Sequence, residues 1–340
     1  MSGVTKSAVE TSGQIESKPT GAIGPVAGVH CHDFLSVCDL APGLIESVFE
    51  TAAAYKADPS AYAGVLAGKS VVMLFEKPSL RTHVTFDIGL TRLGAHVLYL
   101  DHSKQRLGER EAVKDYARNL ERWADAVVAR VFNHSVLLEM ADNATIPIVN
   151  ALSDVEHPCQ ALADLFTIQE RLGTLKGKKI AYVGDGNNVC HSLMLCSAMM
   201  GVDVTVISPK GFEPQYAVVR EAVRLAEQSG ATVRISNTLE AIGGHDAVYT
   251  DAWVSMGQAH QAGLRKDSFV GFQIDEEVMQ RASRGIGAGA IFMHCLPAHR
   301  GEEVIDAVID SDYSVVYDQA ENRMHVQNAL MMLLLGGANA

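Results

Sequence analysis

Residues 70–93 read SVVMLFEKPSLRTHVTFDIGLTRL, and this stretch contains the change of pattern that decides the fold. An uninterrupted apolar run over 70–75 predicts a short buried strand, because such runs are typical of strands that are covered on both faces. The spacing of apolar residues over 82–93 predicts an amphipathic helix. A polar cluster, Ser-Leu-Arg-Thr at 79–82, therefore lies at a turn from a strand into a helix.

The same strand-to-helix unit recurs along most of the chain, and this alternation is typical of a parallel, doubly wound sheet. We expect further strands at His96–Leu100, Ala126–Phe132, Ile146–Ala151, Lys179–Val183, Val202–Ile207, Thr232–Ser236, Ala247–Thr250, Ala290–Met293 and Ser314–Val316. We expect further helices within 33–57 and at Ala112–Trp123, Val136–Ala141, Pro158 to Gly173, Val189–Met200 and Pro214–Ser229.

The boundary between two lobes is expected near residues 155–178. The fold class is therefore α/β, with two doubly wound parallel-sheet lobes. A closing helix over about Met324–Leu335 is apolar enough to pack back on the first lobe. The expected domains are a flexible N-terminal extension over 1–30, a first domain of 31–160 plus 324–340, and a second domain of 161–323.

Composition excludes several classes of protein. The chain has 340 residues with 48% hydrophobic and 20% charged content, which suits a soluble protein with real cores. A formal net charge of −12 argues against a general surface for nucleic acid or anionic membranes. No apolar run reaches the ~18 residues that span a bilayer, and the first 30 residues have no arginine and no secretion core. The cysteines have no disulfide-scaffold spacing, so a cytoplasmic location is expected.

Neither a metal nor an organic cofactor is expected. His30, Cys31 and His32 are adjacent, and no second Cys/His pair follows to complete a zinc site. The Gly-Asp-Gly-Asn-Asn turn at 184–188 is similar to a dinucleotide-binding turn. It lacks the GxGxxG spacing, and the strand after it ends in Ser208 rather than in an acidic residue.

In open parallel sheets, ligands bind where strands end and helices begin. At residues 79–82 the free N–H groups of a helix start favour an anion, and two hydroxyls and a guanidinium add donors suited to phosphate. The alternative is a capped helix start with Ser79 as the N-cap. The local pattern leaves both interpretations open.

Further strand ends and one helix start carry polar residues that can serve chemistry or simple packing. In the first lobe these are Arg130 and the His157-Pro158-Cys159-Gln160 segment. In the second lobe they are the 184–188 turn, Asp251-Ala-Trp-Val-Ser255-Met256-Gly257, His294-Cys295-Leu296-Pro297 and Glu321-Asn322-Arg323. The alternatives without a function are a surface ion pair for Arg130, capping and packing for His157, and apolar filling of the core for Cys295. The division suggests an anionic phosphate compound in one lobe and an amine-bearing compound in the other.

These segments, in this order, resemble the aspartate/ornithine carbamoyltransferase family over residues 33–337. FEKPS-x-RT resembles the family's carbamoyl-phosphate signature, and HPCQ resembles its HPxQ element. DAWVSMG and HCLPAHRGEEV are similar to the ornithine-type elements. The resemblance implies transfer of the carbamoyl group of carbamoyl phosphate to the side-chain amine of L-ornithine, which gives L-citrulline and phosphate. It also implies arginine-type metabolism, a trimer or a multiple of trimers, and no cofactor.

The resemblance also implies site residues. Catalytic roles fall on Arg130, His157 and Cys295. Carbamoyl phosphate would be bound by Ser79, Leu80, Arg81, Thr82, Arg106, Arg130, His157, Gln160, Cys295, Leu296 and Arg323. Ornithine would be bound by Asn188, Asp251, Ser255 and Met256.

Three residues depart from the family pattern, and two other functions stay open. The usual STRTR is here Ser-Leu-Arg-Thr-His, so Leu80 and His83 are departures, and Arg106 stands where a Gln is common. Relatives that act on N-acylated ornithines also vary at the position of Leu80, whereas a carboxylate at Asp251 suits a free α-ammonium. The other classes considered are an NAD(P)-binding oxidoreductase and a catalytically silent homologue.

Overall fold

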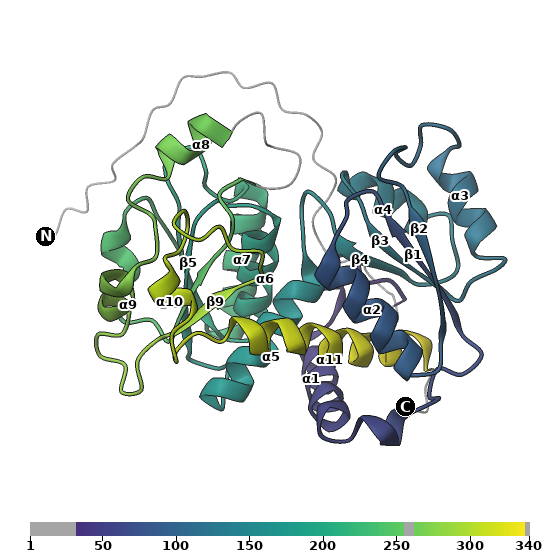
Figure 1. Ribbon diagram of the computed structural model, residues 1–340, viewed down its shortest axis with the longest axis horizontal. Helices are drawn as coiled ribbons and strands as arrows, with labels where there is room; N and C mark the ends of the chain where they lie inside the picture. The colour runs from purple at the N-terminus through teal and green to yellow at the C-terminus, as the bar shows by residue number, and fades with distance from the viewer. Residues whose placement is uncertain (1–31, 255–261, 337–340) are drawn as a thin grey trace, which may run out of the picture.

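The computed structural model describes residues 32–254 and 262–336, and these form two lobes, each built on a parallel sheet (Figure 1). The first sheet has the strand order β2-β1-β3-β4 and the second β7-β6-β5-β8-β9. The strands of the first sheet are β1 (Ser70–Phe75), β2 (His96–Asp101), β3 (Ala126–Arg130) and β4 (Ile148–Leu152). Those of the second are β5 (Lys179–Val183), β6 (Asp203–Ile207), β7 (Val233–Ser236), β8 (Ala247–Thr250) and β9 (Ile291–His294).

Helices cover both sheets and connect their parallel strands, so the expected fold class is confirmed. The helices of the first lobe are α1 (Pro42–Ala57), α2 (Leu80–Arg92), α3 (Val113–Leu120) and α4 (His134–Ala141). Those that follow are α5 (Pro158–Leu172), α6 (Asn188–Met199), α7 (Tyr216–Ser229), α8 (Ala262–Ser268), α9 (Glu276–Ala282), α10 (Asp306–Ile309) and α11 (Val316–Leu335). No helix among the described residues has both the length and the hydropathy that crossing a membrane requires.

The order of strands within each sheet brings the polar strand ends together. β1 is central in the first sheet, between β2 and β3, and every residue of β3 is buried. β5 is central in the second sheet, between β6 and β8. In both sheets the middle strands therefore end on the same side of the sheet. The strand order reverses next to these strand ends, and ligands bind at such a reversal in folds of this kind.

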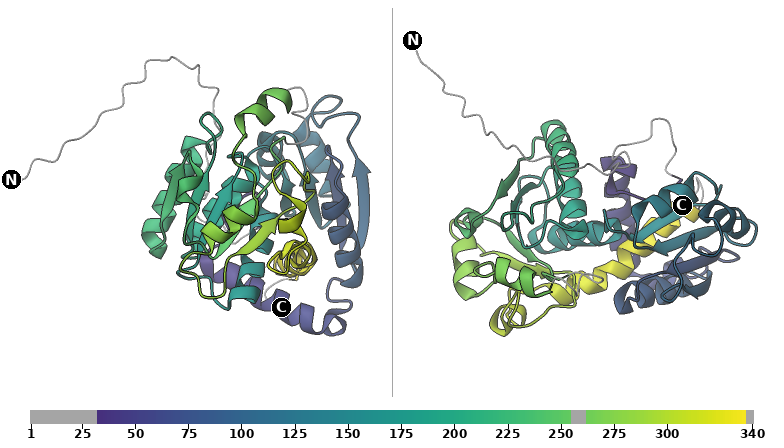
Figure 2. Two further views of the ribbon diagram at one scale, coloured as in Figure 1. Left: turned by 60° about the vertical axis from the view of Figure 1, so that its left-hand side comes forward. Right: turned by 90° about the horizontal axis from the view of Figure 1, so that it is seen from above.

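Helix α11 joins the two lobes. It runs from the second lobe across to the first, and it packs on α5, α1 and α2 (Figures 1 and 2). Its 20 residues correspond to about 30 Å of helix, enough to reach along both lobes. The chain thus closes back on the first lobe, as the sequence predicted.

The expected start of this helix was wrong, and so was the strand over 314–316. Ser314 makes only an isolated bridge to Phe292, and α11 begins at Val316. The polar residues Asn322 and Arg323 were placed just ahead of the closing helix, yet both are buried within it and hydrogen-bonded to α5. The apolar periodicity that marks a helix is interrupted here, because these polar groups face a neighbouring helix.

Candidate active site

A cavity of about 730 Å³ lies between the lobes, and its walls come from both of them. Most of the residues implicated by sequence line it: Ser79, Leu80, Arg81, Thr82, Arg130, His157, Gln160, Asn188, Asp251, Cys295, Leu296 and Arg323. Ser255 and Met256 lie outside the described residues. A smaller, mostly apolar cavity of about 490 Å³ lies between β2 and α3, away from these groups.

The turn from β1 into α2 is a capped helix start, and this cap is compatible with the anion site that the sequence left as the alternative. Ser79 is the N-cap, and its hydroxyl oxygen accepts a hydrogen bond from the Thr82 N–H at 3.3 Å. Helix α2 opens at Leu80, so the first N–H groups of the helix have no partner within the helix and can meet an anion. The Leu80 side chain is 74% exposed, so the departure from Thr leaves the backbone donors in place.

Three guanidinium groups converge on the first-lobe side of the cavity. Arg81 is half-buried, while Arg130 and Arg323 are 4% and 2% exposed. Burial, and then the charge of Arg323, lowers the pKa of Arg130. Since Nε of Arg130 has no hydrogen-bond partner within the described residues, a buried donor is left for a ligand.

His157 is buried among these cations, and its ring is neutral. Burial, and then the charges of Arg323, Arg130 and Arg81, holds the pKa of His157 well below its usual range. The backbone N–H of His157 donates to the Ser192 hydroxyl at 2.9 Å, which fixes this residue at the start of α5. Its Nδ1 has no partner among the described residues, so the ring is free to bond a ligand atom.

Lys77 also lines the cavity, although the sequence reasoning passed it over. The side chain is only 9% exposed, and Nζ lies 4.5 Å from the centroid of the Phe132 ring. Burial, and then the charge of Arg130, lowers the pKa of Lys77. A lysine beside a proline turn is ordinarily solvated, so only the fold reveals this fourth cation.

Arg106 is the one implicated residue that the structure describes outside the cavity lining. Its guanidinium lies over the Phe132 ring instead, with the guanidinium carbon 4.1 Å from the ring centroid. The loop that carries Arg106 is held by Glu76, whose carboxylate accepts from the N–H groups of Leu107 at 2.8 Å and Phe132 at 2.7 Å. Within one chain, Arg106 therefore does not join the converging cations.

The second-lobe wall is built around the carboxylate of Asp251. It accepts hydrogen bonds from the Asn187 amide at 2.8 Å, from the Ala252 N–H at 2.8 Å and from the Cys295 thiol at 3.1 Å. Burial, and then the charge of Asp251, raises the pKa of the Cys295 thiol well above its usual range. Cys295 is therefore a protonated donor rather than a thiolate nucleophile.

A glycine in the turn after β5 lets the backbone of another segment approach closely. A Cβ on Gly186 would lie 2.2 Å from the backbone nitrogen of Pro214, so only glycine fits there. Asn187 caps α6 by accepting from the N–H groups of Val189 and Cys190, both near 3 Å. Asn188 donates to the Ser153 carbonyl at 2.6 Å and so joins the two lobes. The N-terminus of α6 is thus already occupied by a side chain, unlike a dinucleotide-binding turn.

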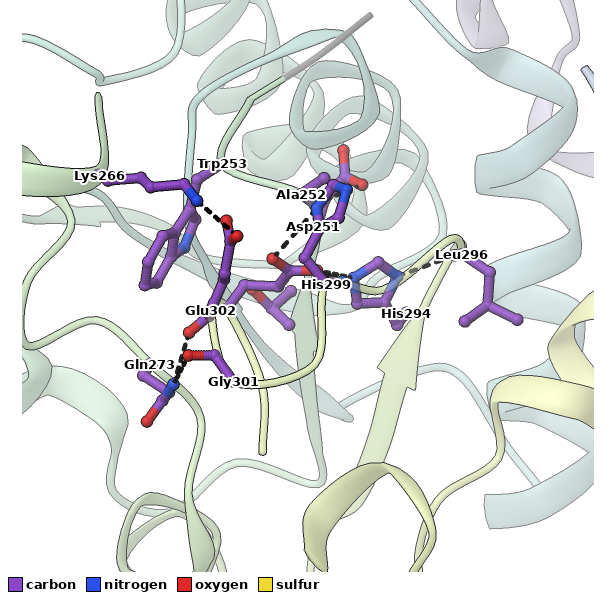
Figure 3. Close-up of polar contacts among 12 residues, drawn as sticks. Asp251, Ala252, Trp253, Lys266, Gln273, His294, Leu296, His299, Gly301 and Glu302 are labelled. Carbon is purple, nitrogen blue, oxygen red and sulfur yellow. Dashed lines mark hydrogen bonds and ion pairs between the residues drawn. The ribbon is translucent and has the colours of Figure 1, made fainter. Parts of the chain in front are cut away.

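The segment after β9 is held by a buried histidine–glutamate pair. The Leu296 N–H donates to Nδ1 of His294 at 2.8 Å (Figure 3). The proton of this ring is therefore on Nε2, which lies 3.2 Å from the Glu303 carboxylate. Leu296 has φ 58°, an unfavourable conformation for leucine that this pair helps to hold. The pair thus fixes the backbone that carries Cys295.

Asp251, His294 and Cys295 bring three metal-type donor atoms within 4.8 Å of one another. Each of them is already committed. Both ring nitrogens of His294 are hydrogen-bonded, and the Cys295 thiol keeps its proton by bonding to Asp251. The arrangement is a hydrogen-bond network rather than an open set of metal ligands.

Replacing Glu303 by alanine is expected to lower the free energy of unfolding by about 3 kcal/mol. The Glu303 carboxylate accepts hydrogen bonds from the buried His294 ring and from the His299 N–H, and the change would leave both donors without a partner. The neighbouring Glu302→Ala is the matched control, because that carboxylate is 32% exposed and pairs with Lys266 at the surface. Its loss is expected to cost under about 1 kcal/mol. Urea unfolding compares the two, and equal losses would contradict the role of the buried pair.

A cavity with converging cations on one wall and a carboxylate–thiol pair on the other defines a two-substrate α/β enzyme. Two family models together match nearly all of the described chain. The carbamoyl-P binding domain of aspartate/ornithine carbamoyltransferase matches residues 32–170, and the Asp/Orn binding domain matches residues 176–334. The chain belongs to the aspartate/ornithine carbamoyltransferase family, and it is a transferase.

Curated relatives and solved structures agree with this family. The chain is 48% identical over 301 residues to an ornithine carbamoyltransferase of Shewanella oneidensis, covering 88% of this chain and 98% of the relative. The ornithine carbamoyltransferase structure from Pyrococcus furiosus is similar at a TM-score of 0.86 and 44% identity, covering 92% of this chain and 100% of that one. A structure of acetylornithine transcarbamylase with acetylcitrulline is similar at a TM-score of 0.79 but only 28% identity, covering 89% and 98%.

Proposed function

We propose that this protein is an ornithine carbamoyltransferase, which moves the carbamoyl group of carbamoyl phosphate to the side-chain amine of L-ornithine. The products are L-citrulline and phosphate. The observation that carries the proposal is the division of the cavity, with guanidinium groups on one wall and Asp251 beside Cys295 on the other. The first wall suits a dianionic phosphate and the second suits an amino acid with two amines.

On the first wall, the phosphate of carbamoyl phosphate is held by the backbone N–H of Leu80 and the side chains of Ser79, Arg81, Thr82 and Arg130. The charge-assisted hydrogen bonds from the guanidinium groups are the strongest of these contacts. The carbamoyl oxygen is polarised by Thr82, Arg130 and His157, of which His157 donates as a neutral ring. Gln160 bonds the carbamoyl NH₂, and Arg323 lies beside it. Cys295 and Leu296 approach the carbamoyl group from the second wall.

On the second wall, Asn188 and Asp251 hold the α-amino and α-carboxylate groups of ornithine, with Ser255 and Met256 of the same segment. Cys295, as a thiol bonded to Asp251, lies beside the side-chain amine. A carboxylate at Asp251 favours a free α-ammonium, which an N-acyl group would remove. The proposal therefore takes free ornithine as the acceptor.

The reaction proceeds by attack of the neutral side-chain amine on the carbamoyl carbon. A C–N bond forms, the carbonyl oxygen becomes an oxyanion, and the C–O bond to phosphate breaks while the surplus amine proton leaves with the phosphate. Donors aimed at the oxyanion supply most of the stabilisation, because Arg130 and His157 are buried and already in place. Holding both substrates in one cavity supplies the remainder by removing the entropy of encounter.

The proposal also covers the domains of the chain, its assembly and its location in the cell. Residues 31–160 with 324–340 form the carbamoyl-phosphate domain, and 161–323 form the ornithine domain. The protein is proposed to be a trimer, or a multiple of trimers, in the cytoplasm, and to serve arginine metabolism. Arg106 is exposed and outside its own cavity, so its proposed role is at the site of a neighbouring copy.

The rate is expected to follow the ionisation of the acceptor amine. With a pKa near ~10.4 for a lysine-like amine, kcat/KM for ornithine should rise about tenfold per pH unit between pH 6.5 and 8.5. His157 adds no step in this window, because its lowered pKa keeps the ring neutral above pH 6.5. The KM for carbamoyl phosphate should stay flat over the same range. A step in that KM near pH 7 would contradict a neutral His157.

An acceptor panel tests the proposed substrate. Purified protein with carbamoyl phosphate is given L-ornithine, N-acetyl-L-ornithine or putrescine, and the carbamoylated products are separated and quantified. We expect turnover with ornithine to exceed turnover with either analogue by at least about 10²-fold, because a site built for polar groups rejects analogues that lack them. Turnover with N-acetylornithine alone would overturn the acceptor and keep the class of reaction.

A further inference from the structure

A chain of buried hydrogen bonds links the two walls of the cavity through Asp164. On the first-lobe side, Arg323 donates to Thr82 at 3.3 Å and to the carbonyl oxygen of the Gln160 side chain. The Gln160 NH₂ group then donates to Oδ1 of Asp164 at 2.8 Å. On the other side, the Gln319 NH₂ group donates to the same oxygen at 2.6 Å.

The members of this chain are shielded from water, so the orientation of each amide depends on its partners within the protein. Gln160 is 1% exposed, and Asp164 and Gln319 are fully buried. The carbonyl oxygen of Gln319 accepts from the His294 N–H at 3.0 Å, beside Cys295 on the second wall. An amide that turned over by 180° would point a donor at a donor at one end and an acceptor at the Asp164 carboxylate at the other.

Asp164 fixes the NH₂ ends of both amides, because an ionised carboxylate only accepts hydrogen bonds, and the guanidinium of Arg323, which only donates, supports the same orientation of Gln160. Burial raises the pKa of Asp164 to about 7. Oδ1 already receives two N–H groups, so a proton would occupy Oδ2 and leave the same acceptor in place. Gln160 and Arg323 line the cavity and Asp164 does not. The NH₂ end of Gln160 is therefore directed away from the cavity, and its oxygen stays on the cavity side with Arg323.

We propose that Asp164 is a positioning residue for substrate choice: by holding the NH₂ of Gln160, it presents the Gln160 carbonyl oxygen to the carbamoyl NH₂. This inference rests on the proposed function. Acetyl phosphate has nearly the same shape as carbamoyl phosphate but a methyl group in place of the NH₂. A Gln160 oxygen that is held toward the substrate favours carbamoyl phosphate, because it can accept a hydrogen bond from the NH₂. A Gln160 amide that is free to turn over can present its own NH₂ instead, and it would then favour neither compound.

The measurement is the ratio of two constants in the full-length protein. These are the KM for carbamoyl phosphate and the Ki for acetyl phosphate as a competitive inhibitor, with the ratio taken as Ki over KM. In the wild type, we expect acetyl phosphate to bind at least about tenfold more weakly. Asp164→Asn keeps an oxygen acceptor at Oδ1, so its ratio should stay within about threefold of the wild type. Asp164→Leu removes the acceptor at similar volume, and its ratio should fall by about tenfold.

Two outcomes overturn the inference. A ratio in Asp164→Leu that equals the wild-type ratio, with both constants raised together, means a purely structural role. A ratio in Asp164→Asn as low as in Asp164→Leu means that charge, and not the acceptor, matters. Where Asp164→Leu does not fold, Asp164→Ser replaces it, because a hydroxyl can donate or accept and so releases the orientation. A wild type that makes no citrulline refutes the proposed function instead, and that result is distinct from these ratios.

Discussion

Replacing Arg81 by alanine is expected to lower kcat/KM for carbamoyl phosphate by about 10³-fold. Arg81 is at the second position of α2, next to the free N–H groups of the helix start, and its guanidinium is half-buried in the cavity. Arg323 cannot replace it, because its guanidinium is already bonded to Gln160 and Thr82. Steady-state kinetics with each substrate varied in turn measures the effect.

The matched control for this change is Arg122→Ala. The Arg122 side chain is 77% exposed near the end of α3, and its guanidinium lies 3.7 Å from the carboxylate of its neighbour Glu121. Its removal should change neither substrate's kcat/KM by more than about twofold, since exposed ion pairs contribute little. Loss of carbamoyl-phosphate use in Arg122→Ala comparable to that in Arg81→Ala would point to net charge rather than to a built anion site.

Replacing Asp251 by asparagine is expected to lower kcat/KM for ornithine by about 10²-fold and to leave carbamoyl-phosphate affinity nearly unchanged. Asparagine keeps the size of the side chain and an oxygen to accept from the Cys295 thiol and the Ala252 N–H. It removes the negative charge that an ammonium group needs. Competitive inhibition by an ornithine analogue, and isothermal titration with phosphate, separate the two affinities.

Asp312→Asn provides the control, because Asp312 is an exposed carboxylate before α11 and away from the cavity lining. It should match the wild type in both assays. The pair Arg81→Ala and Asp251→Asn then tests the division of labour between the walls. Equal losses of both substrates in both variants would contradict that division.

Much of the fold follows from short-range pattern. The strands over 70–75, 179–183 and 247–250 begin and end as predicted, because apolar runs between turn residues mark them clearly. The three short helices α8, α9 and α10 were not predicted. Each has too few turns to establish a periodic signal, and their packing depends on residues distant in sequence.

The residues of the candidate site likewise fall into those that the sequence revealed and those that only the fold revealed. The cluster at 79–82 was singled out at a turn from a strand into a helix, and all four of its residues line the cavity. The departure at His83 has a local explanation: its ring stacks on Tyr99 with centroids 4.0 Å apart, rather than entering the cavity lining. Lys77 and Asp164 escaped prediction, because the features that set them apart are a nearly buried cation and a hydrogen bond to Gln319, 155 positions away. Only the fold brings such partners together.

A crystal structure with carbamoyl phosphate and L-norvaline tests the central claim most directly. Norvaline has the α-groups and the carbon chain of ornithine but no side-chain amine, so both compounds can occupy the cavity without reaction. The account predicts phosphate oxygens at the N-terminus of α2, bonded to Arg81 and Arg130, with the α-groups of norvaline at Asn188 and Asp251. Phosphate density at the 184–188 turn instead, with the amino acid on the arginine wall, would contradict it.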